Sequence, residues 1–216
     1  MKKMEDRHSI AIRLFHWSNM ISITLLIITG FYIHTPNSFR WLFSNMDTPR
    51  MLHFAMAYVL LFGVIGRVYY AIVAKDAHNI VYQPIKDTLK LPSMLKYYLF
   101  MADSHPYYGK YNPGQKLMYT GWLFMALVQI ITGFVLYAPN TFPALAGWLG
   151  GLLAVRIIHY VVNWLFVLSV IVHLYLDLSE GIPVLLSMFT GKIPAEGHGP
   201  SAQSHSKSSD GRSLGA

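Results

Sequence analysis

The chain has 216 residues, of which 54% are hydrophobic and 12% are charged, and its formal net charge is +7. Soluble domains carry about 25% charged residues, so this composition excludes an ordinary soluble domain and indicates an integral membrane protein. The absence of cysteine excludes disulfides, thiolate metal ligands and iron–sulfur clusters held by this chain. A redox cofactor would need other ligands, and the ten histidines are the obvious candidates.

Four apolar stretches predict membrane-spanning helices at about residues 14–35, 51–74, 117–137 and 155–178. Each provides the roughly 20 apolar residues that a helix needs to cross a bilayer. We therefore expect an all-α fold, an integral membrane four-helix bundle that forms one domain over residues 1–190.

The segments outside these helices differ in length and polarity. Residues 75–116 form a long polar loop, which contains LKYYLF, expected to be a short interfacial helix, and the unusual sequence HPYYGKYNPGQK. The stretch FPALAGWLGGLLAV before the fourth helix is expected to be a semi-apolar external loop. Residues 191–216 are low in sequence complexity and are expected to form a disordered cytoplasmic tail.

Basic residues gather on one side of the predicted topology. Of the 17 lysines and arginines, three (Arg40, Arg50 and Arg156) fall on the side opposite to the termini. By the positive-inside rule, this asymmetry places the N- and C-termini of a multi-pass membrane protein in the cytoplasm. The positive charge therefore reports topology and does not indicate nucleic-acid binding.

Four histidines fall at two depths of the predicted helices. His16 and His173 lie near the cytoplasmic side, and His53 and His159 lie near the external side. Histidine is a standard axial ligand of haem, and the core of a helix bundle is a usual place for such a cofactor. The pattern predicts two haems, held by the pairs His16/His173 and His53/His159.

The spacing of the two histidines in the fourth helix supports this prediction. His159 and His173 are fourteen residues apart. At about 100° per residue their side chains share one face of the helix, and they are separated by a rise of about 21 Å. Two haems stacked across a bilayer would require this arrangement.

Other interpretations remain open at this stage. A single intramembrane histidine can simply bond to a neighbouring helix, and a zinc site or a proton pathway is the main alternative to haem. Gly30 and Gly66 fall at the depth of a histidine pair and could let a porphyrin approach, or could serve ordinary helix packing. Arg13, Arg50 and Arg156 could pair with haem propionates or could anchor the helices at the interface.

Several motifs carry a resemblance to a known family: RLFHW, MLHFAMAY, HPYYGKYNPGQKLMY, QIITGFVLY and RIIHY…VHLYLD. Over about residues 8–185 the chain resembles the cytochrome b subunits of membrane-bound, periplasm-facing nickel–iron hydrogenases. It is also similar to the gamma subunits of formate dehydrogenase and to the cytochrome b subunits of thiosulfate reductase. The HPYYGKYNPGQ loop together with TGFVLY favours the hydrogenase branch.

The resemblance implies four membrane-spanning helices that carry two b haems. His16 and His173 would be the axial ligands of the cytoplasmic-side haem iron, and His53 and His159 those of the periplasmic-side haem iron. This assignment agrees with the pairing reached from depth alone.

The resemblance also implies a quinone, either menaquinone or ubiquinone, beside the cytoplasmic-side haem. Asn112, Gly114 and Gln115 match the loop that enters the third helix, so they are candidate quinone contacts. By sequence alone, Asn112-Pro113-Gly114 could equally be a turn that starts this helix.

The implied function is that of an electron-transfer anchor subunit in the lipid of the bacterial cytoplasmic (inner) membrane, and not of the hydrogen-splitting catalytic subunit. It would accept electrons from the hydrogenase small and large subunits at the periplasmic side, around the aromatic loops of Trp41 and Trp148, and pass them to the quinone pool. Protons would come from the cytoplasm through His105 or loop tyrosines, and the complex could form a higher oligomer. The alternatives are the equivalent subunit of a formate dehydrogenase or thiosulfate reductase and, in another class, a haem-free ion transporter.

Overall fold

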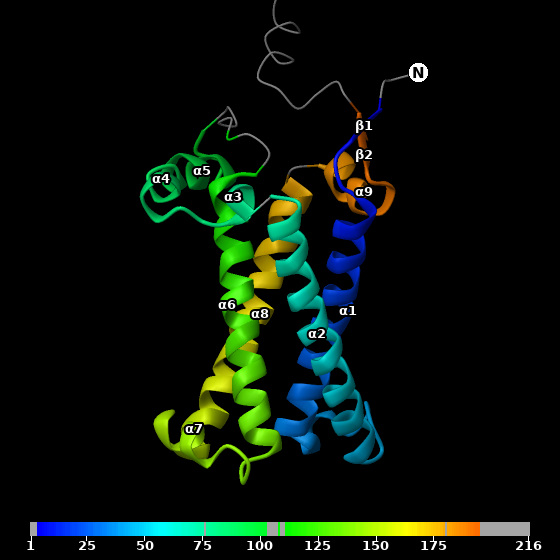
Figure 1. Cartoon of the computed structure of the whole chain (residues 1–216). Helices are drawn as coiled ribbons and strands as arrows, with labels where there is room; N and C mark the ends of the chain where they lie inside the picture. Colours follow the sequence, from blue (N-terminus) through cyan, green and yellow to red (C-terminus); the bar gives the residue numbers. More distant parts are fainter. Residues whose placement is uncertain (1–3, 76, 103–107, 109–110, 180, 195–216) are drawn as a thin grey trace, which may run out of the picture.

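Four long helices form the body of the molecule in the computed structural model, which describes residues 4–75, 77–102, 108, 111–179 and 181–194 (Figure 1). These helices are α1 (Ile10–His34), α2 (Asp47–Val73), α6 (Pro113–Tyr137) and α8 (Gly151–Ser179). Each is long and apolar enough to cross a membrane, and at most 17% of the residues in its most apolar window are buried inside the molecule. Most of their apolar side chains therefore face outwards, as a lipid environment requires. The prediction of an all-α, four-helix membrane protein is confirmed.

Each long helix begins four residues before its predicted start, while its end falls within one residue of the prediction. In α1 and α6 the early start coincides with a polar capping residue outside the apolar stretch. The Ser9 side chain accepts a hydrogen bond from the Ile12 amide (3.3 Å), and Asn112 accepts one from the Gln115 amide (2.8 Å). Such caps satisfy the free amides of the first turn, and hydropathy alone does not register them.

The shorter elements lie at the two ends of the bundle (Figure 1). One end, here named the terminal end, carries α3 (Ala77–Ile80), α4 (Pro84–Thr88), α5 (Leu91–Tyr98), α9 (Ile182–Thr190) and two short strands. The other, the distal end, carries the 3-10 helix η1 (Pro36–Phe39) and α7 (Pro143–Trp148). The short helix predicted in LKYYLF is present as the last part of α5. The stretch around α7, predicted to be a loop, instead contains a helix, which Pro143 starts at a favoured first-turn position.

The strands β1 (Met4–Asp6) and β2 (Lys192–Pro194) pair in antiparallel fashion at the terminal end. Gly191 turns the chain between α9 and β2 with a φ of 79°, a conformation that favours glycine. Its carbonyl accepts hydrogen bonds from the amides of Arg7 (2.8 Å) and His8 (3.2 Å). The segment predicted to be a disordered tail from residue 191 thus starts with three paired residues, and the positions after 194 lie outside the described part.

The long helices pack mainly as two antiparallel pairs, α1 with α2 and α6 with α8. The pairs meet around a central core made by Ala126 of α6 and by Val162 and Phe166 of α8, against which Ile27 of α1 and Val64 of α2 pack. This core lies between the two levels at which the histidines occur.

Candidate functional site

The four histidines of the long helices form two close pairs at opposite ends of the bundle. The ring centres of His53 (α2) and His159 (α8) are 6.4 Å apart near the distal end. The ring centres of His16 (α1) and His173 (α8) are 6.3 Å apart near the terminal end. The structure thus brings together the residues that their depth in the sequence pairs, and α8 contributes one histidine to each level.

Each distal histidine contacts a threonine of the neighbouring helix. Nδ1 of His53 lies 2.9 Å from Oγ1 of Thr29 on α1. Nδ1 of His159 lies 2.8 Å from Oγ1 of Thr132 on α6, and the Gln129 side-chain amide donates to the main-chain oxygen of His159 (3.1 Å). Because both rings are engaged through Nδ1, Nε2 is the nitrogen that each ring has left for a ligand.

A cavity of about 1010 Å³ surrounds the distal pair and is lined by His53, His159, Gly30, Gly133 and Phe166 among others. A Cβ on Gly30 would lie 3.5 Å from Cε1 of His53, and one on Gly133 would lie 3.6 Å from Cε1 of His159. Glycine therefore leaves space beside both rings. Small-molecule cavities usually measure about 300–1,000 Å³, so this one has room for a large cofactor.

The other predicted glycine behaves differently. A Cβ on Gly66 would lie 2.8 Å from Cε1 of Phe15. Gly66 thus serves the close packing of α2 on α1. Its neighbour there is Phe15, the residue before His16, and not a histidine ring.

Basic and aromatic side chains also line the distal cavity. Arg50 and Arg156 belong to its lining, as does the His34 ring, which stacks on Tyr160 with ring centres 4.0 Å apart. Arg13, the third arginine considered from the sequence, instead donates from its guanidinium to the main-chain oxygen of Phe189 at the terminal end.

The terminal pair has a similar spacing but different surroundings. Nε2 of His173 lies 3.5 Å from a carboxylate oxygen of Asp177, one helical turn further along α8, and the Trp122 ring meets the His173 ring edge-on at 5.1 Å. Nδ1 of His16 is buried and has no hydrogen-bond partner within the described residues.

The candidate quinone residues at the start of α6 have clear roles in the fold. Asn112 and Gln115 form a reciprocal capping box, in which the Asn112 amide also donates to the Gln115 side chain (3.0 Å). The side-chain amide of Asn112 donates to the Tyr98 hydroxyl (3.3 Å). Gly114 is buried against Met94, where an added Cβ would lie 2.7 Å from the methyl carbon.

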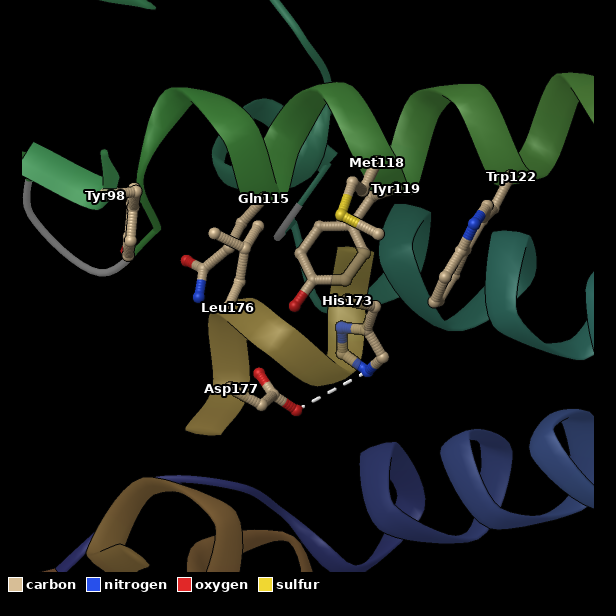
Figure 2. A pocket seen from close by; sticks show the side chains of 8 residues that line it. All are labelled: Tyr98, Gln115, Met118, Tyr119, Trp122, His173, Leu176 and Asp177. Atoms are coloured by element: carbon tan, nitrogen blue, oxygen red, sulfur yellow. Dashed lines mark ion pairs between the residues drawn. The ribbon is translucent and has the colours of Figure 1, made fainter. Parts of the chain in front are cut away.

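Of these three residues, Gln115 also lines a small cavity of about 30 Å³ beside His173. Figure 2 shows Gln115, Tyr119 and Trp122 pointing from α6 towards His173 and Asp177 on α8. Amide, hydroxyl, imidazole and carboxylate groups therefore converge at the terminal edge of the bundle. His105, considered from the sequence as a route for protons, lies outside the described residues.

Sequence reasoning missed Thr29 and Thr132. The signal was present as the similar strings TGFYI and TGFVLY, which place a threonine and a glycine together in both helices. Each string turns its threonine towards Nδ1 and its glycine towards Cε1 of the same histidine.

Comparison with known proteins identifies the family. Residues 7–191 match the family model described as "Prokaryotic cytochrome b561". The chain belongs to this family.

The cytochrome is similar to several proteins named as hydrogenase subunits. It is 32% identical over 189 residues, 79% of each chain, to the "Probable Ni/Fe-hydrogenase B-type cytochrome subunit" of Azotobacter vinelandii. It is 29% identical over 196 residues to the protein of the same name in Cupriavidus necator, covering 79% of this chain and 78% of the relative. It is 26% identical over 191 residues to the "Probable Ni/Fe-hydrogenase 1 B-type cytochrome subunit" of Escherichia coli K12, covering 79% of this chain and 81% of the relative. The resemblance that the motifs indicated is confirmed.

Membership in a b-type cytochrome family implies haem b, and the residues of the cytochrome fit this group. Imidazole nitrogens bind metal ions at about 2.0–2.1 Å, so two rings on opposite sides of one iron have centres about 6.3 Å apart. The two observed separations, 6.4 and 6.3 Å, match this span. At the distal level, the cavity and its two arginines also suit a large apolar ring with two carboxylates.

A zinc site of the protein-only kind fits less well. Within the described residues, no group of three or more His, Asp or Glu side chains gathers in a way that could hold a metal ion, whereas zinc sites use three or four protein ligands. Paired histidines suit a metal whose remaining ligands come from a macrocycle.

Proposed function

We propose that this cytochrome carries electrons from a periplasmic nickel–iron hydrogenase across the membrane to a quinone. The observation that carries the proposal is the presence of two histidine pairs at opposite ends of one bundle, joined by α8. The helical rise of about 21 Å between His159 and His173 covers most of the roughly 30 Å apolar core of a bilayer.

His53 and His159 are the proposed axial ligands of one haem b, and His16 and His173 those of a second. A bound b haem supplies a reversible one-electron carrier at each level. At the distal level, Arg50 and Arg156 are placed to neutralise the propionates. At the terminal level, binding of an iron through Nε2 of His173 would replace its contact with Asp177, which is 3.5 Å long.

Apolar residues occupy the middle of the bundle between the two levels. Phe166 lies seven residues from His159 and seven from His173, is 4% exposed, and packs in the central core. Seven residues make almost two full turns, so its ring shares the face of α8 that carries both histidines. It separates the two sites without interrupting the apolar interior.

The quinone site of this proposal lies at the terminal edge, where the start of α6 meets the end of α8. Gln115 and Tyr119 offer hydrogen-bonding groups beside His173, and Asn112 and Gly114 shape the turn that holds Gln115. A quinone ring is larger than the 30 Å³ cavity, so its entry would require the side chains that line the cavity to move apart. Reduction to quinol takes two electrons and two protons, and the protons come from the cytoplasm.

The partner of this proposal docks at the distal end. Trp41 and Trp148 are 79% and 81% exposed there, and the charge distribution supports a periplasmic position for this end. The names of the relatives favour a nickel–iron hydrogenase over a formate dehydrogenase or thiosulfate reductase. Hydrogen oxidation outside and proton uptake inside would together build a membrane potential.

The test is purification of the complex from membranes in mild detergent, with identification of its subunits and a reduced-minus-oxidised spectrum. We expect hydrogenase small and large subunits, two b haems per chain, and reduction of both haems by hydrogen. His53→Ala should lose about one haem equivalent and stop hydrogen-driven quinone reduction. His205→Ala, in the C-terminal tail, is the control and should keep both haems and full activity.

Three outcomes would contradict the proposal. Absence of a b-type band would support a haem-free transporter. Retention of two haems by the His53→Ala variant would refute the ligand pairs. Recovery of formate dehydrogenase or thiosulfate reductase subunits in place of hydrogenase would change the electron donor.

A further inference from the structure

The two distal histidines have matching supports from two different helix pairs. Thr29 and Gly30 of α1 contact His53 of α2, and Thr132 and Gly133 of α6 contact His159 of α8. In each case the threonine oxygen meets Nδ1 and the glycine leaves space at Cε1. The same three-residue arrangement therefore approaches the distal cavity from both sides.

The other hydrogen bond of each threonine determines which atom is the donor between the threonine and the imidazole. The Thr29 hydroxyl donates to the main-chain oxygen of Leu25 (2.6 Å), and the Thr132 hydroxyl donates to that of Val128 (2.6 Å). A hydroxyl has one hydrogen, and a carbonyl oxygen can only accept. Because that hydrogen is already used, each Oγ1 accepts a hydrogen bond from the histidine. The proton shared between Oγ1 and the imidazole therefore lies on Nδ1.

We propose that Thr29 and Thr132 are positioning residues that hold His53 and His159 in the Nδ1-protonated form and thereby set the redox potential of the distal haem. In this form the lone pair lies on Nε2, which is the nitrogen left for a metal. This inference rests on the proposed function only in naming haem as the ligand. The imidazole tautomer itself is a property of the protein alone.

The terminal pair lacks this support within the described residues. Nδ1 of His16 has no partner there, and the charged neighbour of His173 faces its Nε2. The two levels therefore differ in their outer hydrogen bonds although their ring separations are nearly equal. An effect of the threonines should appear at one haem and not at both.

The direction of the effect follows from ligand basicity. An imidazole that donates from Nδ1 becomes a stronger electron donor at Nε2, and the chain of hydrogen bonds through the threonine to the carbonyl polarises that donation further. A stronger donor favours the oxidised metal and lowers its reduction potential. Removing the threonine hydroxyl should raise the potential of the distal haem and weaken its binding.

The experiment uses Thr29→Val and Thr132→Val, singly and together, in the purified full-length cytochrome. Valine keeps the size of threonine and removes the acceptor oxygen. Thr29→Ser and Thr132→Ser restore that oxygen, and Thr24→Val removes a hydroxyl from an exposed face of the same helix, where its neighbour is Met20. The measurements are a redox titration that resolves the two haems and the transfer of haem to apomyoglobin.

We expect the valine variants to shift the distal haem to higher potential and to loosen it by about 10- to 100-fold, the usual loss when an outer partner of a metal ligand is removed. The redox potential of the terminal haem should not change. The serine variants should return towards the parent values, and Thr24→Val should match the parent. Two bound haems with unchanged potentials and unchanged transfer rates in the double valine variant would overturn the proposal.

A second measurement separates this inference from the proposed function. Nitrogen-15 histidine spectra of the haem-free protein report the tautomer directly, with His53 and His159 assigned from the valine variants. Nδ1-protonated rings in the parent support the inference, even if the purified protein were to bind no haem. Nε2-protonated rings in the parent would overturn it, whatever the electron donor proves to be.

Discussion

Gly30 and Gly133 leave room beside the two distal histidines, and this room is limited. An added methyl group would stand at ordinary contact distance from either ring, at 3.5 and 3.6 Å. A branched side chain would extend into the cavity itself. The positions therefore accept a small residue and exclude a large one, as expected where a flat cofactor lies against the helix backbone.

Gly30→Leu and Gly133→Leu should each remove the distal haem while leaving the terminal haem in place, because leucine fills space beside His53 or His159. Gly30→Ala and Gly133→Ala are matched controls that should keep two haems. The measurement is haem per chain by the pyridine haemochrome method on purified protein. Full haem content in both leucine variants would show that the cofactor does not lie between these helices.

Among the elements, the start of α6 combines a structural cap with a proposed quinone contact. The Asn112 oxygen accepts from the Gln115 amide (2.8 Å) and its nitrogen donates to Tyr98 (3.3 Å). Both atoms of one side chain are thus used within the fold, and substitution affects the helix start before it affects any ligand.

Asn112→Ala should reduce the free energy of unfolding by about 1 kcal/mol, the usual effect of losing an N-cap. Asn112→Asp keeps the accepting oxygen and suits the positive end of the helix, so its stability should stay close to the parent. Thermal unfolding in detergent measures the stability of both variants. Quinone reduction kinetics at full haem content test whether Asn112 also contacts the quinone. Slow quinone turnover in the aspartate variant would assign Asn112 a direct contact, and parental turnover in both variants would limit it to capping.

The same elements show what could be read from the sequence. Apolar length predicted the four helices, and histidine depth predicted which rings meet, because both follow from position along a single helix. The contacts of Thr29 with His53 and of Thr132 with His159 depend on how two helices rotate against each other, which one sequence does not reveal. The pairing of β1 with β2 joins segments from opposite ends of the chain, and no local pattern in three residues predicts such a partner.

At the scale of the whole molecule, the strands bring both ends of the described chain to one end of the bundle (Figure 1). An even number of spans between the termini requires them to share a side of the membrane. Within the described residues, most lysines and arginines belong to the terminal half of the bundle, whereas Arg40, Arg50 and Arg156 belong to the distal half. Under the positive-inside rule, we therefore expect the terminal end to face the cytoplasm and the pair His53/His159 to face the periplasm.

The orientation can be tested because the chain has no cysteine, so one introduced cysteine is a unique label. Ser44 lies in the exposed distal loop after η1, and Ser204 lies in the C-terminal tail. In intact spheroplasts, a membrane-impermeant maleimide should label Ser44→Cys at once and Ser204→Cys only after the membrane is permeabilised, because the proposed topology assigns the two residues to opposite sides. The reverse pattern would place the distal histidines on the cytoplasmic side, where a periplasmic hydrogenase could not reach them. Labelling of both before permeabilisation would contradict three spans between Ser44 and Ser204 or show a leaky membrane. A cysteine in a cytoplasmic marker protein distinguishes these two outcomes.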